Sequence, residues 1–147
     1  AVFEIIEAIL GKPQSGRAND EMRNKRGLAY DVGVMYENFV NFSFFAINVG
    51  IDEKNRKKAK ALLKELWKLE HITADELKHA KNYITGKLEL ELEDPHRHAE
   101  LLTFWQQTKG KDFTKEYFKS VKNVTIDDIK KTINKYTKVT EVSLVPQ

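Results

Sequence analysis

The chain has 147 residues, 41% of them hydrophobic, with 25 Lys and Arg against 22 Asp and Glu for a net charge of +3. This composition suits one folded domain with its own core and excludes a disordered chain. Cysteine is absent, which excludes disulfide scaffolds, thiolate metal sites and cysteine nucleophiles.

Hydropathy and charge patterning narrow the class further. No apolar run reaches the ~18 residues that cross a bilayer, and no signal-peptide pattern is present. Together with the lack of cysteine, this favours a cytoplasmic location. Most lysines stand beside acidic residues on expected helices, which is typical of a solvated surface. A nucleic-acid protein would concentrate its cations on one face, so we expect no nucleic-acid partner.

The first half of the chain predicts two helices and a hairpin. "AVFEIIEAIL" has the apolar pattern of a helix from its first residue, without a capping residue or an initiator Met. We therefore expect a piece of a longer protein. A breaker-rich loop over 11–16 precedes a helix over 17–26 that stops at Gly27. Alternation over 28–37 and a second strand over 41–50 predict an antiparallel hairpin.

The second half predicts helices and one closing strand. A long helix is expected over 52–69, and "TADE" opens the next as a capping box of Thr73 and Glu76. Further helices follow from Pro95 and over 113–121, and Thr125 with Asp128 caps the last. "EVSLVP", residues 141–146, alternates and reads as a strand that returns to the sheet. We expect one α+β domain over 1–147, with an antiparallel sheet and helices on one face.

Candidate chemistry is sparse. "HRHAE" contains His96, His98 and Glu100, but only His96 and Glu100 have the spacing that puts two ligands on one helix face. We interpret it as a polar helix start. There is no nucleophile elbow, P-loop or H-x-x-E-H motif. The residues alone therefore predict no catalytic set and no bound metal or cofactor.

"GRANDEMRNKRGLAYDVGV", residues 16–34, resembles the pitrilysin and insulinase family of zinc peptidases, which includes the mitochondrial processing peptidases. The likeness is an Arg on a short helix followed by Gly-Leu-Ala-Tyr leading into a strand. "FEIIEAILG" before it, and "NVTIDDIKKTINKY" and "EVSLVP" at the end, follow the family order, so the resemblance covers essentially the whole chain.

The resemblance implies one half of a clam-like peptidase. In that family one α+β half-unit carries H-x-x-E-H and holds zinc, whereas the other supplies an Arg and a Tyr, seven residues apart, that touch the bound peptide. Arg23 and Tyr30 have this spacing, and H-x-x-E-H is missing. The resemblance thus implies the non-zinc, C-terminal half-unit without its first strand, partnered by a zinc-bearing half and an extended peptide. The residues alone suggest a solvated Arg23 and a core or cross-strand Tyr30.

Three functions remain open at this stage. The first is the substrate-binding half of a zinc metalloendopeptidase, which is not catalytic by itself. The second is a structural or interaction subunit, because the family includes members that have lost catalysis. The third is an isolated module with an unrelated partner. The sequence also leaves open whether Arg23 and Tyr30 stabilise a transition state or only bind substrate.

Overall fold

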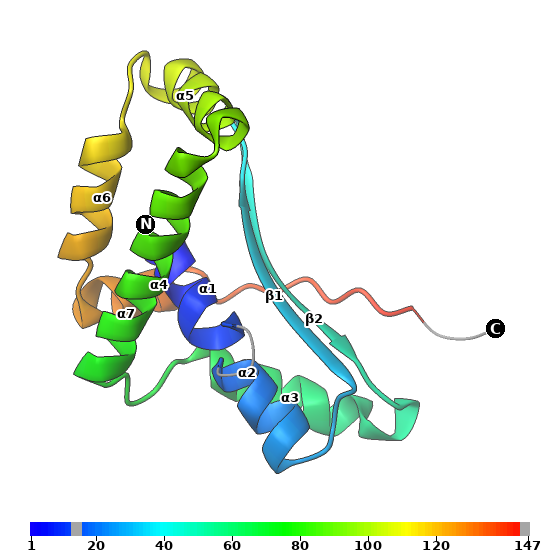
Figure 1. Cartoon of the computed structure of the whole chain (residues 1–147). Helices are drawn as coiled ribbons and strands as arrows, with labels where there is room; N and C mark the ends of the chain where they lie inside the picture. The colour runs from blue at the N-terminus through cyan, green and yellow to red at the C-terminus, as the bar shows by residue number, and fades with distance from the viewer. Residues whose placement is uncertain (13–15, 145–147) are drawn as a thin grey trace.

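The computed structural model describes residues 1–12 and 16–144, and Figure 1 shows helices gathered on one side of a long β-hairpin. The helices are α1 (Val2–Gly11), α2 (Arg17–Asn19), α3 (Arg56–Trp67), α4 (Ala74–Glu93), α5 (Pro95–Lys109), α6 (Thr114–Asn123) and α7 (Ile126–Lys135). A π-helix, η1 (Asp20–Lys25), continues α2, and a 3₁₀ turn, η2 (Glu53–Asn55), precedes α3. The strands are β1 (Asp31–Asn38) and β2 (Ser43–Gly50). The α+β fold class is confirmed.

The helix caps form as predicted. The Thr73 hydroxyl accepts the Glu76 N–H at 3.1 Å, and the Glu76 carboxylate accepts the Thr73 N–H at 3.0 Å. The same reciprocal pair joins Thr125 and Asp128 at the start of α7. Both capping boxes satisfy amides that have no partner within their helix. The loop expected over 11–16 lies partly outside the described residues, because 13–15 are not described.

The hairpin begins later than the alternation predicts. β1 and β2 pair antiparallel from Asp31 opposite Gly50 to Asn38 opposite Ser43. The predicted start at Leu28 is wrong, because the Leu28 N–H donates to the Met22 carbonyl at 2.8 Å and stays with the end of η1. A backbone N–H that is hydrogen-bonded to the end of a helix cannot also donate to a neighbouring strand.

One face of the hairpin packs against helices. Phe3 of α1 stacks on Tyr36 of β1 with ring centroids 5.2 Å apart. Phe45, opposite Tyr36 in β2, meets Trp67 of α3 edge-on at 5.2 Å. The inward alternation of the strands is thus confirmed from Val32 onward, where the partners are half-buried.

Helix α1 lies at the centre of the core. Its Ile5, Ile6 and Leu10 side chains are fully buried, and the helix contacts α2, α4, α7 and β1. Burying such a side chain contributes about 1.5–3 kcal/mol, so α1 is the main apolar element that joins the helices to the hairpin. In Figure 1 this helix, in dark blue, passes behind α4 and beside β1.

Residues 141–144 do not form the closing strand that the sequence predicts. Residues 137–144 form an irregular segment, seen in Figure 1 passing the hairpin toward the C-terminus, and 145–146 lie outside the described residues. Val142 and Leu144 are 84% and 98% exposed, so neither alternating side chain packs on the sheet. Glu141 instead pairs with Arg56, at 3.3 Å, and with Lys60. A strand needs a partner for its ladder of hydrogen bonds, and these side-chain pairs do not provide one.

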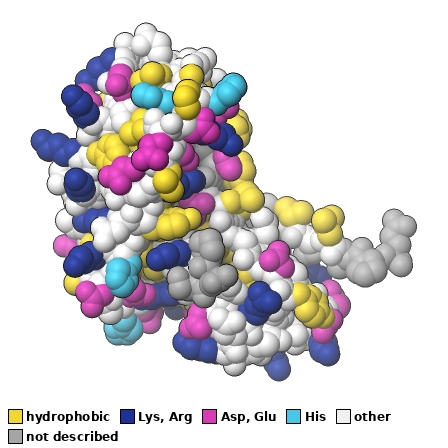
Figure 2. Space-filling model, viewed as in Figure 1, with side chains coloured by type: hydrophobic (Ala, Val, Ile, Leu, Met, Phe, Trp, Pro, Cys, Tyr) yellow, Lys and Arg dark blue, Asp and Glu magenta, His cyan; other side chains and the backbone are white. Residues whose placement is uncertain are grey.

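On the face seen in Figure 2, basic and acidic side chains are interspersed over the helices. Opposite charges at short range cancel each other's field, so this face does not carry one extended basic surface. Among the described residues, no helix is both long and apolar enough to cross a membrane.

Candidate substrate-binding site

A sharp corner separates η1 from β1. Gly27 adopts a left-handed conformation, with φ of 56°, and its N–H donates to the Arg23 carbonyl at 3.1 Å. The N–H groups of Leu28 and Ala29 both donate to the Met22 carbonyl, at 2.8 and 3.3 Å. Gly27 therefore caps the helix end as predicted, because a left-handed residue lets the following chain fold back onto the last carbonyls.

Tyr30 lies just beyond this corner and is 65% exposed. Of the two positions expected for Tyr30, the core position is therefore wrong, whereas the cross-strand position agrees with its backbone pairing. The Tyr30 N–H donates to the Gly50 carbonyl at 2.8 Å and extends the hairpin pairing by one bond. The Tyr30 hydroxyl donates to the Asp52 carboxylate. This hydrogen bond raises the pKa of Tyr30 and lowers the pKa of Asp52, because it stabilises the ionised carboxylate and the neutral phenol.

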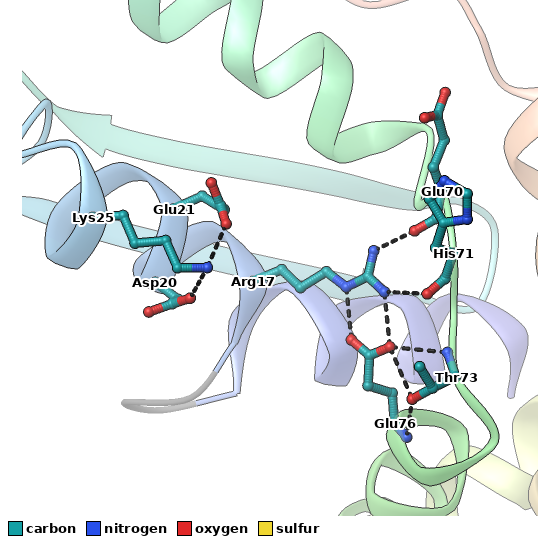
Figure 3. Close-up of polar contacts among 8 residues, drawn as sticks. All are labelled: Arg17, Asp20, Glu21, Lys25, Glu70, His71, Thr73 and Glu76. Atoms are coloured by element: carbon teal, nitrogen blue, oxygen red, sulfur yellow. Dashed lines mark hydrogen bonds and ion pairs between the residues drawn. The ribbon is translucent and has the colours of Figure 1, made fainter.

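Arg23 is on the other side of the corner, exposed near the end of η1. In the part of the chain that the structure describes, its guanidinium makes no ion pair. Its neighbours differ: the Arg26 guanidinium is 3.1 Å from Glu21, and the Lys25 ammonium bridges Asp20 and Glu21 at 2.8 and 2.7 Å. Figure 3 shows the Lys25 bridge.

The corner thus brings Arg23 and Tyr30 to the surface from two successive elements. Neither side chain is buried, and they are not hydrogen-bonded to each other in the described structure. Arg23 offers only hydrogen-bond donors and Tyr30 both a donor and an acceptor. Arg23 is therefore free to donate to a ligand, whereas Tyr30 keeps only its acceptor capacity because its hydrogen is donated to Asp52.

An open pocket of about 430 Å³ adjoins the corner. Arg26 and Leu28 line it from the corner, and Lys58, Leu62 and Glu65 are among the residues that line it from α3. It therefore offers an apolar floor with charges of both signs at its edge.

Sequence reasoning missed Arg17. Its Nε and Nη2 atoms donate to the two carboxylate oxygens of Glu76 at 2.7 and 2.8 Å. Its Nη1 and Nη2 atoms also donate to the carbonyls of Glu70 and His71 at 2.7 and 3.1 Å. Figure 3 shows all four bonds converging on one guanidinium. Arg17 therefore ties the start of α2 to the loop before α4.

Glu76 has a double role in this anchor. It closes the Thr73 capping box and receives the Arg17 guanidinium in a bidentate pair. The pKa of Glu76 is lowered to about 2, and the largest cause is its hydrogen bonding with Arg17. The capping box was visible in the sequence, but no local pattern links Glu76 to an arginine 59 residues away.

The histidine segment forms a helix start, as predicted. Asp94 caps α5 by accepting the N–H groups of His96 and Arg97 at 2.8 and 3.4 Å. Glu100 pairs with Arg97 at 2.9 Å. Within residues 1–12 and 16–144, no three His, Asp or Glu side chains are grouped so that they could hold a metal ion.

Comparisons with known proteins agree with this fold. A protease from Helicobacter pylori is 21% identical, with a TM-score of 0.78 over 93% of this chain and 34% of that one. A peptidase M16 inactive domain from Pseudomonas fluorescens is 18% identical, with a TM-score of 0.74 over 91% of this chain and 33% of that one. The periplasmic protease PqqL from Escherichia coli is 13% identical, with a TM-score of 0.68 over 92% of this chain and 15% of that one.

These solved structures share the fold, and the chain spans about a third of the length of the first two. No curated protein matches the chain significantly. A family model described as the peptidase M16 inactive domain matches residues 1–84, which include Arg23, Tyr30 and the whole hairpin. Because this match covers more than half of the chain, the chain belongs to the peptidase M16 inactive-domain family, as its resemblance to the pitrilysin and insulinase peptidases predicted.

Proposed function

We propose that the chain is the substrate-binding, non-zinc half-unit of a zinc metalloendopeptidase, in which Arg23 and Tyr30 contact an extended peptide. The observation that carries the proposal is the exposed Arg23–Tyr30 corner inside a peptidase inactive domain. The related protease from Helicobacter pylori is about three times longer than the matched region, which leaves room there for a second half-unit.

The chemistry of the pair supports this role. Attack on a peptide carbonyl places negative charge on its oxygen, and a guanidinium is a strong donor to such an oxygen. The same groups would also bind the carbonyls of an unreacted peptide, which increases affinity without increasing the rate of the chemical step. As a donor in either role, a side chain must not already be paired inside the protein, and Arg23 meets this condition in the described structure.

The hairpin supports an extended substrate. In the described residues, β1 and β2 pair only with each other, so each presents an outer edge. A peptide that adds a strand to such an edge gains main-chain hydrogen bonds, and its side chains occupy neighbouring pockets. β1 begins one residue after Tyr30, so a peptide along this edge would end beside the corner.

Zinc does not fit this chain. The described residues contain no suitable group of ligands, and the proposal places the metal in a partner half-unit, in the same longer chain or in a separate subunit. This chain would contribute binding and orientation of the peptide, and the partner would contribute the hydrolytic step.

A second candidate function is a non-catalytic interaction subunit. The hairpin tip carries Phe39, Val40 and Phe42 at 47%, 50% and 61% exposure, and the two phenyl rings stack at 4.6 Å. Adjoining exposed apolar side chains of this kind are typical of a contact surface. This candidate predicts assembly with a partner without any effect of Arg23 or Tyr30 on peptide cleavage.

Reconstituted cleavage separates the two candidates. The chain is mixed with a zinc-bearing half-unit, and kcat/KM is measured on an unstructured peptide. Tyr30→Phe and Arg23→Ala are each expected to lower kcat/KM about 10- to 100-fold, the effect of losing one good hydrogen-bond donor or acceptor. Lys25→Ala removes an equal charge from the same helix end and does not line the pocket, so it should leave kcat/KM within about twofold. If all three variants cleave like the wild type, the interaction subunit is the better account.

A further inference from the structure

The contact between Tyr30 and Asp52 sets the direction of the Tyr30 hydroxyl. A phenol has one hydrogen, and an ionised carboxylate has only acceptors. The lowered pKa of Asp52 keeps its carboxylate ionised at neutral pH. The hydrogen of Tyr30 therefore lies on the Asp52 side of the hydroxyl.

Both partners are held in place by the backbone. The Tyr30 N–H is bonded to the Gly50 carbonyl at 2.8 Å, and Gly50 lies opposite Asp31 at the end of the hairpin. Asp52 follows two residues later, with an extended backbone, as the residue that precedes η2. Its carbonyl accepts the Asn55 N–H at 2.8 Å, and its carboxylate is 3.4 Å from the Lys54 ammonium. The contact thus joins the start of β1 to the end of β2.

This geometry leaves Tyr30 as an acceptor toward any ligand. Its ring is 65% exposed, and once the hydrogen is given to Asp52, the oxygen offers only lone pairs. Arg23, on the other side of the corner, offers only donors. A peptide main chain presents C=O and N–H groups in alternation, which matches one donor and one acceptor better than two donors.

We propose that Asp52 is a positioning residue that holds the Tyr30 hydroxyl as an acceptor, and that Tyr30 thereby recognises a main-chain N–H of the bound peptide. The inference rests on the proposed function of the corner. It assigns Tyr30 to substrate binding rather than to donation toward the reacting oxygen, and it defines a substrate class. Peptides with a secondary amide at this position bind, whereas proline or an N-methylated residue there is disfavoured.

The test is an N-methyl scan of a peptide that competes with a reporter substrate for the chain assembled with its zinc-bearing half. With the wild type, methylation at one position should weaken inhibition about tenfold beyond its neighbours, the effect of one lost hydrogen bond. In Tyr30→Phe this extra penalty should disappear. In Asp52→Ala, which removes the acceptor and so releases the phenol hydrogen, the penalty should fall to about twofold.

Two controls make the result specific to Asp52. Glu53→Ala removes a neighbouring negative charge that does not contact Tyr30, and it should retain the full tenfold penalty. In the free chain, ultraviolet titration, taken as the difference from a matched Tyr30→Phe variant because the chain has five tyrosines, should give a Tyr30 pKa that is raised in the wild type and in Glu53→Ala but not in Asp52→Ala. A folded Asp52→Ala variant whose Tyr30 titrates like the wild type would overturn the inference without any peptide.

The failure of this inference differs from the failure of the proposed function. If Arg23→Ala and Tyr30→Phe cleave normally, the corner does not bind substrate, and both ideas are wrong. If both variants cleave poorly but no methylated position depends on Tyr30, only the acceptor role is wrong. The latter result would indicate that Tyr30 donates to a carbonyl.

Discussion

Arg17 and Arg23 stand six residues apart on one continuous helical segment, and the protein uses them in opposite ways. The Arg17 guanidinium makes four hydrogen bonds to Glu76, Glu70 and His71, whereas Arg23 is exposed and unpaired in the described structure. An arginine whose donors are satisfied internally stabilises the fold. An arginine whose donors face solvent is available to a ligand, so the comparison separates a structural anchor from a candidate site.

The largest expected effect is on stability at the anchor. Arg17→Ala should lower the free energy of unfolding by about 2–3 kcal/mol, because it leaves a partly buried carboxylate and two carbonyls without their donor. Arg23→Ala should cost no more than about 0.5 kcal/mol, as for other exposed residues. Urea unfolding followed by circular dichroism measures both. Equal losses for the two variants would show that the comparison is wrong.

Acid should weaken the anchor in a defined pH window. The pKa of Glu76 falls from its ordinary 4.5 to about 2 on folding, so the unfolded chain binds the proton more readily between these values. The contribution of Glu76 is therefore complete above about pH 4.5 and is lost as pH falls toward 2, by roughly 1–2 kcal/mol after allowance for its partial exposure.

The acid effect has its own control. Unfolding free energies of the wild type and of Glu76→Gln are compared at pH 6 and pH 3. The difference between the two proteins should shrink at pH 3, where the wild-type carboxylate is losing its advantage. A difference that stays constant would mean that Glu76 is not the group that titrates.

A smaller effect is expected at the corner itself. Gly27→Ala meets no atom within 4 Å, but a φ of 56° strains a residue with a Cβ, so a loss of about 1 kcal/mol is expected. Gly86→Ala, inside α4 and also without a neighbour within 4 Å, should instead stabilise by about 0.5–1 kcal/mol. Changes of opposite sign in the free energy of urea unfolding for the two variants would support the left-handed conformation of Gly27. Stabilisation by both substitutions would argue against it.

Local patterns predicted most of the fold. Capping boxes at Thr73 and Thr125, the helix end at Gly27 and the hairpin all depend on residues close together in the chain, and all are confirmed. The prediction of a closing strand was wrong because strand formation depends on a distant partner, which alternation does not reveal. The Arg17–Glu76 anchor was missed for the same reason, since its partners are 59 residues apart.

The candidate site was predicted less completely. The family resemblance selected Arg23 and Tyr30, but alternation alone placed Tyr30 on the buried side of a strand that in fact starts after it. The Tyr30–Asp52 contact joins two ends of the hairpin, so it could be found only after the register was known. What the pair does to a peptide remains a prediction for experiment.

The kcat/KM of Arg23→Ala, assembled with a zinc-bearing half-unit, tests the central claim most directly. It is measured with Arg17→Ala and the wild type at a temperature where all three are folded. Arg23→Ala should cleave about 10- to 100-fold more slowly with unchanged stability, whereas Arg17→Ala should lose stability and retain most of its kcat/KM. If Arg23→Ala has the same kcat/KM as the wild type, the claim that this corner binds substrate is contradicted.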